Sequence, residues 1–263
     1  MCIRDRYRII DFDLSNMSNS GISNVGIVAK SNFQSLMDHV GSGSAYDLSK
    51  RRSNLSILPP YDGKAFSSFV ETIYNMHGYI EHCREEYVLI SQGNVITNID
   101  YTDVFDFHSK KKADITLIYK NHAIPQGYDR PITLDVDNDG KVNQIFVKPG
   151  VVDKEVFNHA YGSILIKKDI LMSEIRNAIS VNQLDVKRLL QSSLGKYSIY
   201  AYENKGYCAA ISSINDYFEF NMDLMKKEVR DELFNPQRPI YTKVRDDACL
   251  LYTSPSPRDP KTS

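Results

Sequence analysis

Apolar residues along this chain follow two alternating spacings. In some stretches they recur every three or four positions, as on one side of an amphipathic helix, and in others they form the short runs typical of buried strands. This pattern predicts strands at 24–30, 87–91, 113–120, 163–167, 198–202 and 207–211. It predicts helices at 32–40, within 65–83, near 168–180, at 185–193 and at 214–229. The strand–helix alternation favours a mainly parallel, doubly wound α/β sheet.

One predicted hairpin interrupts this alternation. Residues 131–147 contain two apolar runs joined by the turn sequence D-N-D-G at 137–140. An antiparallel hairpin of this kind makes the predicted sheet mixed. Before the strand at 113–120, we expect Thr102 to cap a helix whose apolar face includes Val104, Phe105 and His108.

The strand predicted at 87–91 is followed by Gln92, Gly93 and Asn94. In an open α/β sheet, ligands bind just beyond the carboxyl ends of the strands. A nucleotide or metal–phosphate site uses an anionic oxygen at such a position, because Mg²⁺ prefers carboxylate ligands. Asn94 carries a neutral amide instead, so the chain has a binding-site position without the charge that this chemistry uses.

Composition narrows the possible functions without selecting one. The chain has 263 residues, 42% of them hydrophobic and 25% charged, and a net charge of −1, so we expect no nucleic-acid or membrane partner. Its four cysteines form no C-x-x-C pair, which argues against a zinc site and indicates reduced thiols and a cytoplasmic location. The sequence contains no membrane-length apolar run, P-loop, G-x-S-x-G or H-E-x-x-H motif.

The two ends depart from the pattern of the interior. Residues 1–5 and the proline- and serine-rich residues 247–263 both resemble translated adapter sequence at the ends of genes assembled from environmental reads. We expect both segments to be non-native and the tail to be disordered, because its prolines prevent a helix or a central strand. The native protein is then expected to extend beyond both ends.

Ordered blocks along the interior carry a family resemblance. They are R-Y-R-I-I-D-F-D-L-S-N-M-S-N-S-G-I at 6–22, G-N-V-I-T-N-I-D-Y at 93–101, F-V-K-P at 146–149 and G-Y-C-A-A-I-S-S at 206–213. In order, they resemble K/R-Y-R-I-I-D-F-x-L-S-N-x-x-N-S-G-I, G-D-H-I-Y-x-M-D-Y, F-x-E-K-P and G-Y-W-x-D-V-G-T of the glucose-1-phosphate adenylyltransferases, also called ADP-glucose pyrophosphorylases. The stretches N-M-D-L at 221–224 and P-I-Y-T at 239–242 also fit.

This resemblance implies a Rossmann-like, doubly wound mixed sheet of the nucleotidyltransferase type over residues 6–246, truncated before a left-handed β-helix domain. Members of the family join ATP and glucose 1-phosphate to give ADP-glucose and pyrophosphate for glycogen or starch synthesis. Their catalytic subunits hold Mg²⁺ with the aspartates of G-D and D-V-G-T, and they hold the sugar phosphate with the glutamate and lysine of E-K-P. The amino-terminal phosphate loop G-x-G-T-R-L of the family is absent here.

The matching site positions have lost their acidic groups. Asn94 and Ala210 stand where the resemblance places the metal-binding aspartates, Val147 stands at the glutamate, and Lys148 alone keeps its family identity. We therefore expect no intact catalytic residue, no metal site and no cofactor in this chain. Lys148 leaves a cation that permits weak glucose 1-phosphate binding. Another carboxylate, such as Asp100, could take over metal binding only if both lost ligands were replaced together.

These losses favour a regulatory, catalytically deficient subunit that pairs with a catalytic subunit in a heterotetramer of glycogen biosynthesis. Three alternatives remain open. The first is an active sugar-nucleotide pyrophosphorylase of different specificity, which would need an intact metal pair. The second is a stand-alone sensor of sugar phosphate or nucleotide, and the third is a structural remnant without a ligand.

Overall fold

The computed structural model describes residues 7–29, 33–49, 54–58, 68–122, 132–146 and 157–243. The described helices are α2 (Ile9–Asn19), α3 (Phe33–Val40), the 3₁₀ turn η1 (Ser44–Tyr46), α4 (Phe69–Asn75), α5 (His77–His82), α6 (Tyr101–Lys111), α7 (Lys168–Ser180), α8 (Val186–Ser193), α9 (Ile214–Asp223) and α10 (Lys227–Leu233). The described strands are β1 (Asn24–Val28), β2 (Asn54–Leu58), β3 (Tyr87–Ile90), β4 (Val95–Thr97), β5 (Ile115–His122), β6 (Ile132–Val136), β7 (Val142–Phe146), β8 (Phe157–Lys167), β9 (Ile199–Glu203) and β10 (Cys208–Ala210).

The central sheet is built around the long strand β8. Strand β5 pairs along one edge of β8, and β6 and β3 pair with successive parts of the other edge. The order β7-β6-β8-β5-β9 completes the sheet, and β1–β2 and β10–β4 form two smaller ladders. The mixed α/β class is confirmed. A mainly parallel sheet is wrong for the described strands, because β8 runs antiparallel to β3, β5 and β6, and only β5–β9 and β1–β2 are parallel.

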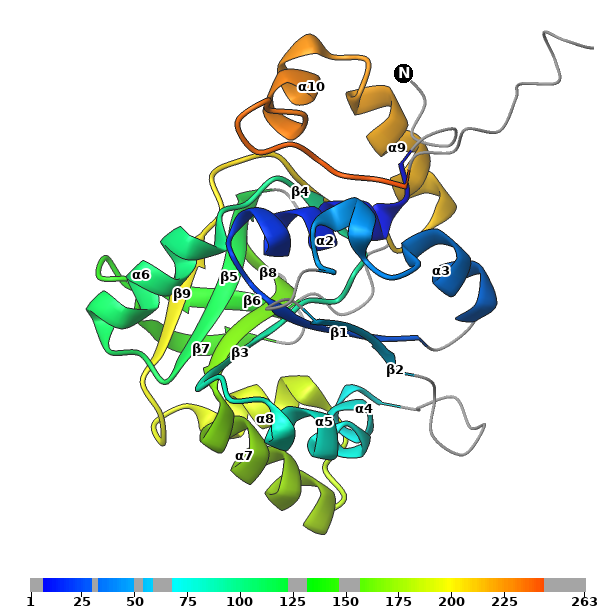
Figure 1. Ribbon diagram of the computed structural model, residues 1–263. Helices are drawn as coiled ribbons and strands as arrows, with labels where there is room; N and C mark the ends of the chain where they lie inside the picture. The colour runs from blue at the N-terminus through cyan, green and yellow to red at the C-terminus, as the bar shows by residue number, and fades with distance from the viewer. Residues whose placement is uncertain are drawn as a thin grey trace, which may run out of the picture.

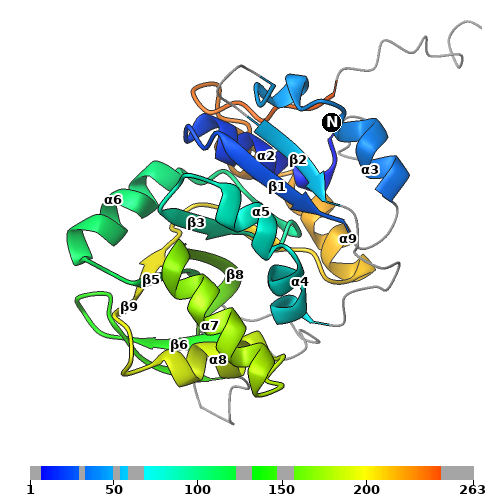
Figure 2. The same ribbon diagram turned by 60° about the horizontal axis from the view of Figure 1, so that its bottom comes forward.

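Helices cover both faces of the central sheet (Figures 1 and 2). On β5, Ile115 and Leu117 point into a core shared with α4, α5, α7 and α8, whereas Ile118 packs on the opposite side with Val104 of α6. This alternation follows from the two-residue period of a strand. The predicted hairpin at 131–147 is confirmed by the antiparallel pairing of β6 and β7.

Two helices predicted as continuous are each divided. The stretch 65–83 contains α4 and α5, which are separated at Met76, and Gly78 follows this break with its low helix propensity. The stretch 214–229 contains α9, a turn, and the beginning of α10. The cap predicted at Thr102 is also wrong: the side chain of Asp100 accepts the hydrogen bond from the Thr102 N–H, so the helix begins two residues earlier.

The two ends of the described chain meet at the buried carboxylate of Asp11. Its Oδ1 accepts hydrogen bonds from Tyr46 (2.6 Å) and lies 2.6 Å from Nε2 of His39, and its Oδ2 accepts from Thr242 (2.7 Å) and from the backbone N–H of Arg8 (2.8 Å). A buried charge needs such partners. The network therefore connects α2 to α3, to η1 and to the segment around Thr242. Within the described part of the chain, no helix has the length and apolar character needed to cross a membrane.

Candidate functional site

The short β4–β10 ladder brings Asn94 and Ala210 side by side. Val95 pairs with Ala210 in this antiparallel ladder, Asn94 directly precedes β4, and Ile211 directly follows β10. Helix α2 packs against the ladder, and Asn16 of this helix donates a hydrogen bond to the carbonyl of Thr97 at 2.9 Å (Figure 1). The two positions singled out in sequence are therefore neighbours, although they are 116 positions apart along the chain (210 − 94).

The amide of Asn94 is held by the backbone of the neighbouring strand. The Ile211 N–H donates to the backbone carbonyl of Asn94 at 2.8 Å, and Nδ2 of Asn94 donates to the carbonyl of Ile211 at 3.2 Å. A carboxylate has no N–H and cannot make the second bond. The Oδ1 atom of Asn94 is buried and has no hydrogen-bond partner. The local structure therefore depends on the N–H group of the Asn94 side chain, which a carboxylate lacks.

Ala210, the second of these positions, supplies no metal ligand. Ala210 ends in a methyl group, and Cys208 on the same strand is a free thiol whose pKa is raised to about 12 by burial. A protonated thiol is a poor metal ligand at neutral pH. Within the described residues, no cluster of three or more His, Cys, Asp or Glu side chains is arranged to hold a metal ion. At these two positions, the neutral Oδ1 atom of Asn94 is the one oxygen that a side chain offers to a metal. The residues present therefore do not fit the Mg²⁺ that the family resemblance implies.

Asp100 does not replace the missing carboxylates. Its Oδ1 accepts from the N–H of Thr102 at 2.8 Å and from Ser20 at 3.3 Å, and its Oδ2 accepts from Arg238 at 2.6 Å. Partial burial acts to raise the pKa of Asp100, but the Thr102 and Arg238 interactions outweigh it and hold this pKa below its ordinary value. Asp100 thus caps the beginning of α6 and binds Arg238.

Sequence reasoning missed one carboxylate close to this site. Asp13 on α2 is buried, its Oδ1 accepts a hydrogen bond from Ser91 at 3.0 Å, and its Oδ2 has no partner. A Cβ added to Gly93 would lie 3.9 Å from that Oδ2. Burial raises the pKa of Asp13 to about 6. The available signal was its place at the variable position of the 6–22 block, where this chain carries a charge on a helix that packs inward.

Val147 and Lys148 lie outside the described residues. The sugar-phosphate position at Lys148 therefore stays a prediction.

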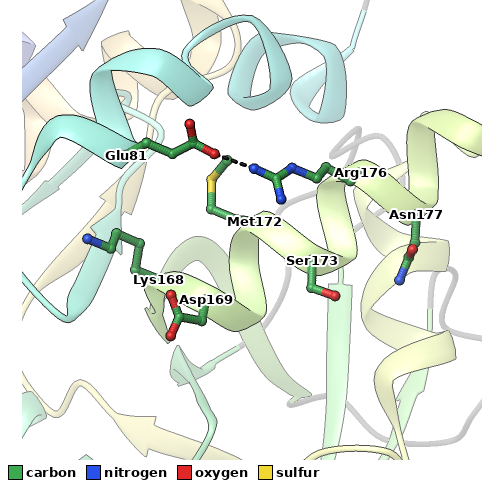
Figure 3. Close-up of a pocket in the computed structure, with 7 residues that line it drawn as sticks. All are labelled: Glu81, Lys168, Asp169, Met172, Ser173, Arg176 and Asn177. Carbon is green, nitrogen blue, oxygen red and sulfur yellow. Dashed lines mark hydrogen bonds and ion pairs between the residues drawn. The ribbon is translucent and has the colours of Figure 1, made fainter.

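A separate hollow lies on the far side of the central sheet, between α5 and α7 (Figure 3). Its volume is about 490 Å³, and it is lined by Glu81, Lys168, Asp169, Met172, Ser173, Arg176 and Asn177. Three of its charged side chains already have protein partners, since Arg176 pairs with Glu81 and Lys168 donates to the carbonyl of Cys83 at 2.8 Å. Of the predicted site residues that the structure describes, none lines this hollow.

Comparison with known proteins agrees with the fold and with the sequence blocks. A family described as "Nucleotidyl transferase" matches residues 1–227. The glucose-1-phosphate adenylyltransferase of Bacillus subtilis (strain 168) is 31% identical over 249 residues, which is 90% of this chain and 64% of that protein. The chain belongs to the glucose-1-phosphate adenylyltransferase family of nucleotidyl transferases.

Two further relatives bear on this family member. The glycogen biosynthesis protein GlgD of the same Bacillus strain is 27% identical over 251 residues, 94% of this chain and 62% of that protein. A crystal structure of a putative glucose-1-phosphate thymidylyltransferase from Bacillus anthracis superposes with a TM-score of 0.67 at 13% identity, covering 88% of this chain and 86% of that one. The second likeness concerns the fold alone. The chain spans less than two thirds of the length of both B. subtilis relatives.

Proposed function

We propose that this chain is the nucleotidyltransferase part of a regulatory, catalytically deficient subunit of glucose-1-phosphate adenylyltransferase. It acts in glycogen biosynthesis in the cytoplasm and pairs with a catalytic subunit in a heterotetramer. The observation that carries the proposal is the hydrogen bond from Asn94 Nδ2 to the Ile211 carbonyl, next in sequence to Ala210. The sequence resemblance assigns metal-binding aspartates to positions 94 and 210, which are neighbours along the backbone of this ladder, and neither position carries an anion here.

The missing charges are large on the scale of catalysis. A unit charge about 4 Å from a divalent ion contributes roughly 8 kcal/mol at an effective dielectric of 20. Every 1.4 kcal/mol or so changes a rate tenfold. Since nucleotidyl transfer relies on metal-neutralised phosphate charge, losing both anions removes many decades of activity.

The retained scaffold is the second support for the proposal. The apolar faces of the central sheet are intact, and Ile90, Leu117 and Ile164 are all buried. Decay without selection would also have placed polar residues at such core positions. One Bacillus strain contains a relative named as the adenylyltransferase and a second named for glycogen biosynthesis, so two family members occur together in one organism.

The test is co-expression of the complete gene with the glucose-1-phosphate adenylyltransferase of the same organism. We expect the two proteins to co-purify and the complex to differ from the catalytic subunit alone in apparent substrate affinity or maximal rate. As a control, replacing both metal-binding aspartates of the catalytic partner by asparagine should abolish activity of the complex. Separate elution at micromolar concentration with an unchanged rate contradicts the proposal.

A stand-alone sensor of sugar phosphate is the second candidate, and Lys148 favours it. Glucose 1-phosphate binding, measured by titration calorimetry, is expected to be weak and to be lost in Lys148→Ala. Equal binding by both proteins rules out a Lys148 site. A size measurement with and without the catalytic subunit separates the sensor from the regulatory subunit, because the sensor stays a single species.

A further inference from the structure

A small pocket lies beneath α2, between the β4–β10 ladder and the central sheet. Its volume of about 10 Å³ suits a single water molecule or ion. The polar side chains that line it are Asp13, Thr97, Tyr101, Tyr161, Ser163, Asn204 and Cys208. The amide of Asn204 donates to the Thr97 hydroxyl at 2.9 Å. The pocket is next to the degenerate site, because the Thr97–Cys208 pair is the next pair on the same face of the ladder after Val95–Ala210.

Asp13 is the unusual member of this lining. It is only 5% exposed, and although the Ser91 hydroxyl and the Gly93 backbone N–H interact with the carboxylate, its Oδ2 is left without a hydrogen bond of good geometry. Within the described part of the chain, no lysine, arginine or histidine forms an ion pair with it. A buried carboxylate without a counter-charge is strongly disfavoured, so such groups are paired, bound to a cation or protonated.

The other groups around the pocket are suited to a hard cation. Hydroxyl groups of Thr97, Tyr101, Tyr161 and Ser163 carry the oxygen atoms that alkali and alkaline-earth ions prefer. One carboxylate balances one positive charge, whereas a divalent ion would leave an uncompensated charge in the same volume. The described residues also lack the clusters of His, Cys, Asp or Glu that hold transition metals.

We propose that this pocket binds one small monovalent cation, of the size of Na⁺, against the Asp13 carboxylate. The bound cation braces α2 against the turn that carries Asn94, because Asp13 is already joined to this turn through Ser91. This inference does not depend on the regulatory role proposed above. It predicts a structural ion in a family member whose two metal-binding aspartates are gone.

Thermal unfolding of the purified chain at pH 8 tests the proposal. Midpoints are compared in NaCl, KCl and choline chloride at one ionic strength. Na⁺ at a hundredfold excess over its dissociation constant should raise the midpoint by about 5 °C relative to choline, and the rise should saturate with concentration. Asp13→Asn should lose the rise, whereas the exposed control Asp106→Asn should keep it.

Equal midpoints in NaCl and choline chloride overturn the proposal, as does an equal Na⁺ response of Asp13→Asn. If Asp13 is protonated and binds no cation, the unfolding midpoint of the wild type does not depend on the salt cation. That midpoint then falls with rising pH, whereas the midpoint of Asp13→Asn does not. Tyr101 and Cys208, which face Asp13, do not titrate near the pKa of Asp13, since burial raises the pKa values of both groups. If Asp13→Asn fails to fold, the wild-type comparison of Na⁺ with choline still decides.

Discussion

Asn94 and Ile211 are joined by two hydrogen bonds, one from the Ile211 N–H to the Asn94 backbone carbonyl and one from the Asn94 side chain to the Ile211 carbonyl. The second bond requires a donor, and an aspartate at this position would direct a carboxylate at a carbonyl oxygen. The amide therefore has a structural use at the position where the sequence resemblance implies a metal-binding aspartate. Restoring the acid alone does not restore the family's site.

Asn94→Asp should therefore destabilise the protein. We expect a loss of about 1–3 kcal/mol in the free energy of unfolding, because the partly buried carbonyl of Ile211 loses its donor and faces a new charge. Urea denaturation at neutral pH measures this change. The matched control is Asn143→Asp at an exposed position of β7, which should change stability by less than about 0.5 kcal/mol. An Asn94→Asp variant as stable as the control contradicts the role of the amide.

The Asp11 network predicts a second stability effect. Tyr46→Phe removes a 2.6 Å hydrogen bond to a buried carboxylate, and such charged bonds contribute roughly 1.5–3 kcal/mol. The control is Tyr74→Phe, since the Tyr74 ring is on the surface against His77. Chemical denaturation should separate the two variants by at least about 1 kcal/mol. Equal stabilities would mean that Asp11 does not depend on Tyr46.

Asp13 makes stability depend on pH in a defined direction. Burial raises the pKa of Asp13 from 3.8 to about 6, so the folded state binds this proton more tightly than the unfolded state does. Stability from this group is fully present below about pH 4 and is lost as pH rises to about 6, a change of about 3 kcal/mol.

The comparison with Asp13→Asn isolates this effect in sodium-free buffer, because the variant has no proton to lose. We expect the free energy of unfolding of the variant, relative to the wild type, to increase between pH 4 and pH 6. Other groups, such as His108, contribute equally to both proteins. A difference that stays constant across this range contradicts the raised pKa.

Helix α9 offers a comparison between two phenylalanines. Phe218 is 64% exposed, whereas Phe220 is 1% exposed and packs with Phe12 of α2 and Ile96 of β4. Phe220→Ala should lower the free energy of unfolding by about 3–5 kcal/mol. Phe218→Ala should change it by less than about 0.5 kcal/mol. Similar losses in both variants would show that the outer face of α9 is covered in solution.

The periodicity of the chain was enough to predict most elements and the faces that they bury. Ile115, Leu117 and Ile164 read as strand residues and are buried in the central sheet. The breaks at Met76 and after Asp223 were not predicted, because the apolar stripe continues across each turn and only the tertiary packing divides it. The direction of β8 also depends on contacts distant in sequence.

The candidate site was predictable in its positions and not in its details. Block resemblance aligned Asn94 and Ala210 with the family's metal-binding aspartates, and the β4–β10 ladder brings the two positions close together along the backbone. The hydrogen bond to Ile211 depends on backbone register, which residue types do not reveal. Asp13 was missed because no helix was predicted at 9–19, and the burial of this residue arises from the packing of α2 against the ladder.

ADP-glucose formation from ATP and glucose 1-phosphate with Mg²⁺ tests the central claim most directly. The complete gene product, free of host enzyme, should be assayed beside the B. subtilis glucose-1-phosphate adenylyltransferase under identical conditions. Our account predicts no product above that of a heat-denatured sample, because neither Asn94 nor Ala210 supplies the anion that holds the metal. Turnover within about a hundredfold of the B. subtilis enzyme, a gap of only about 2.7 kcal/mol in barrier, would contradict it.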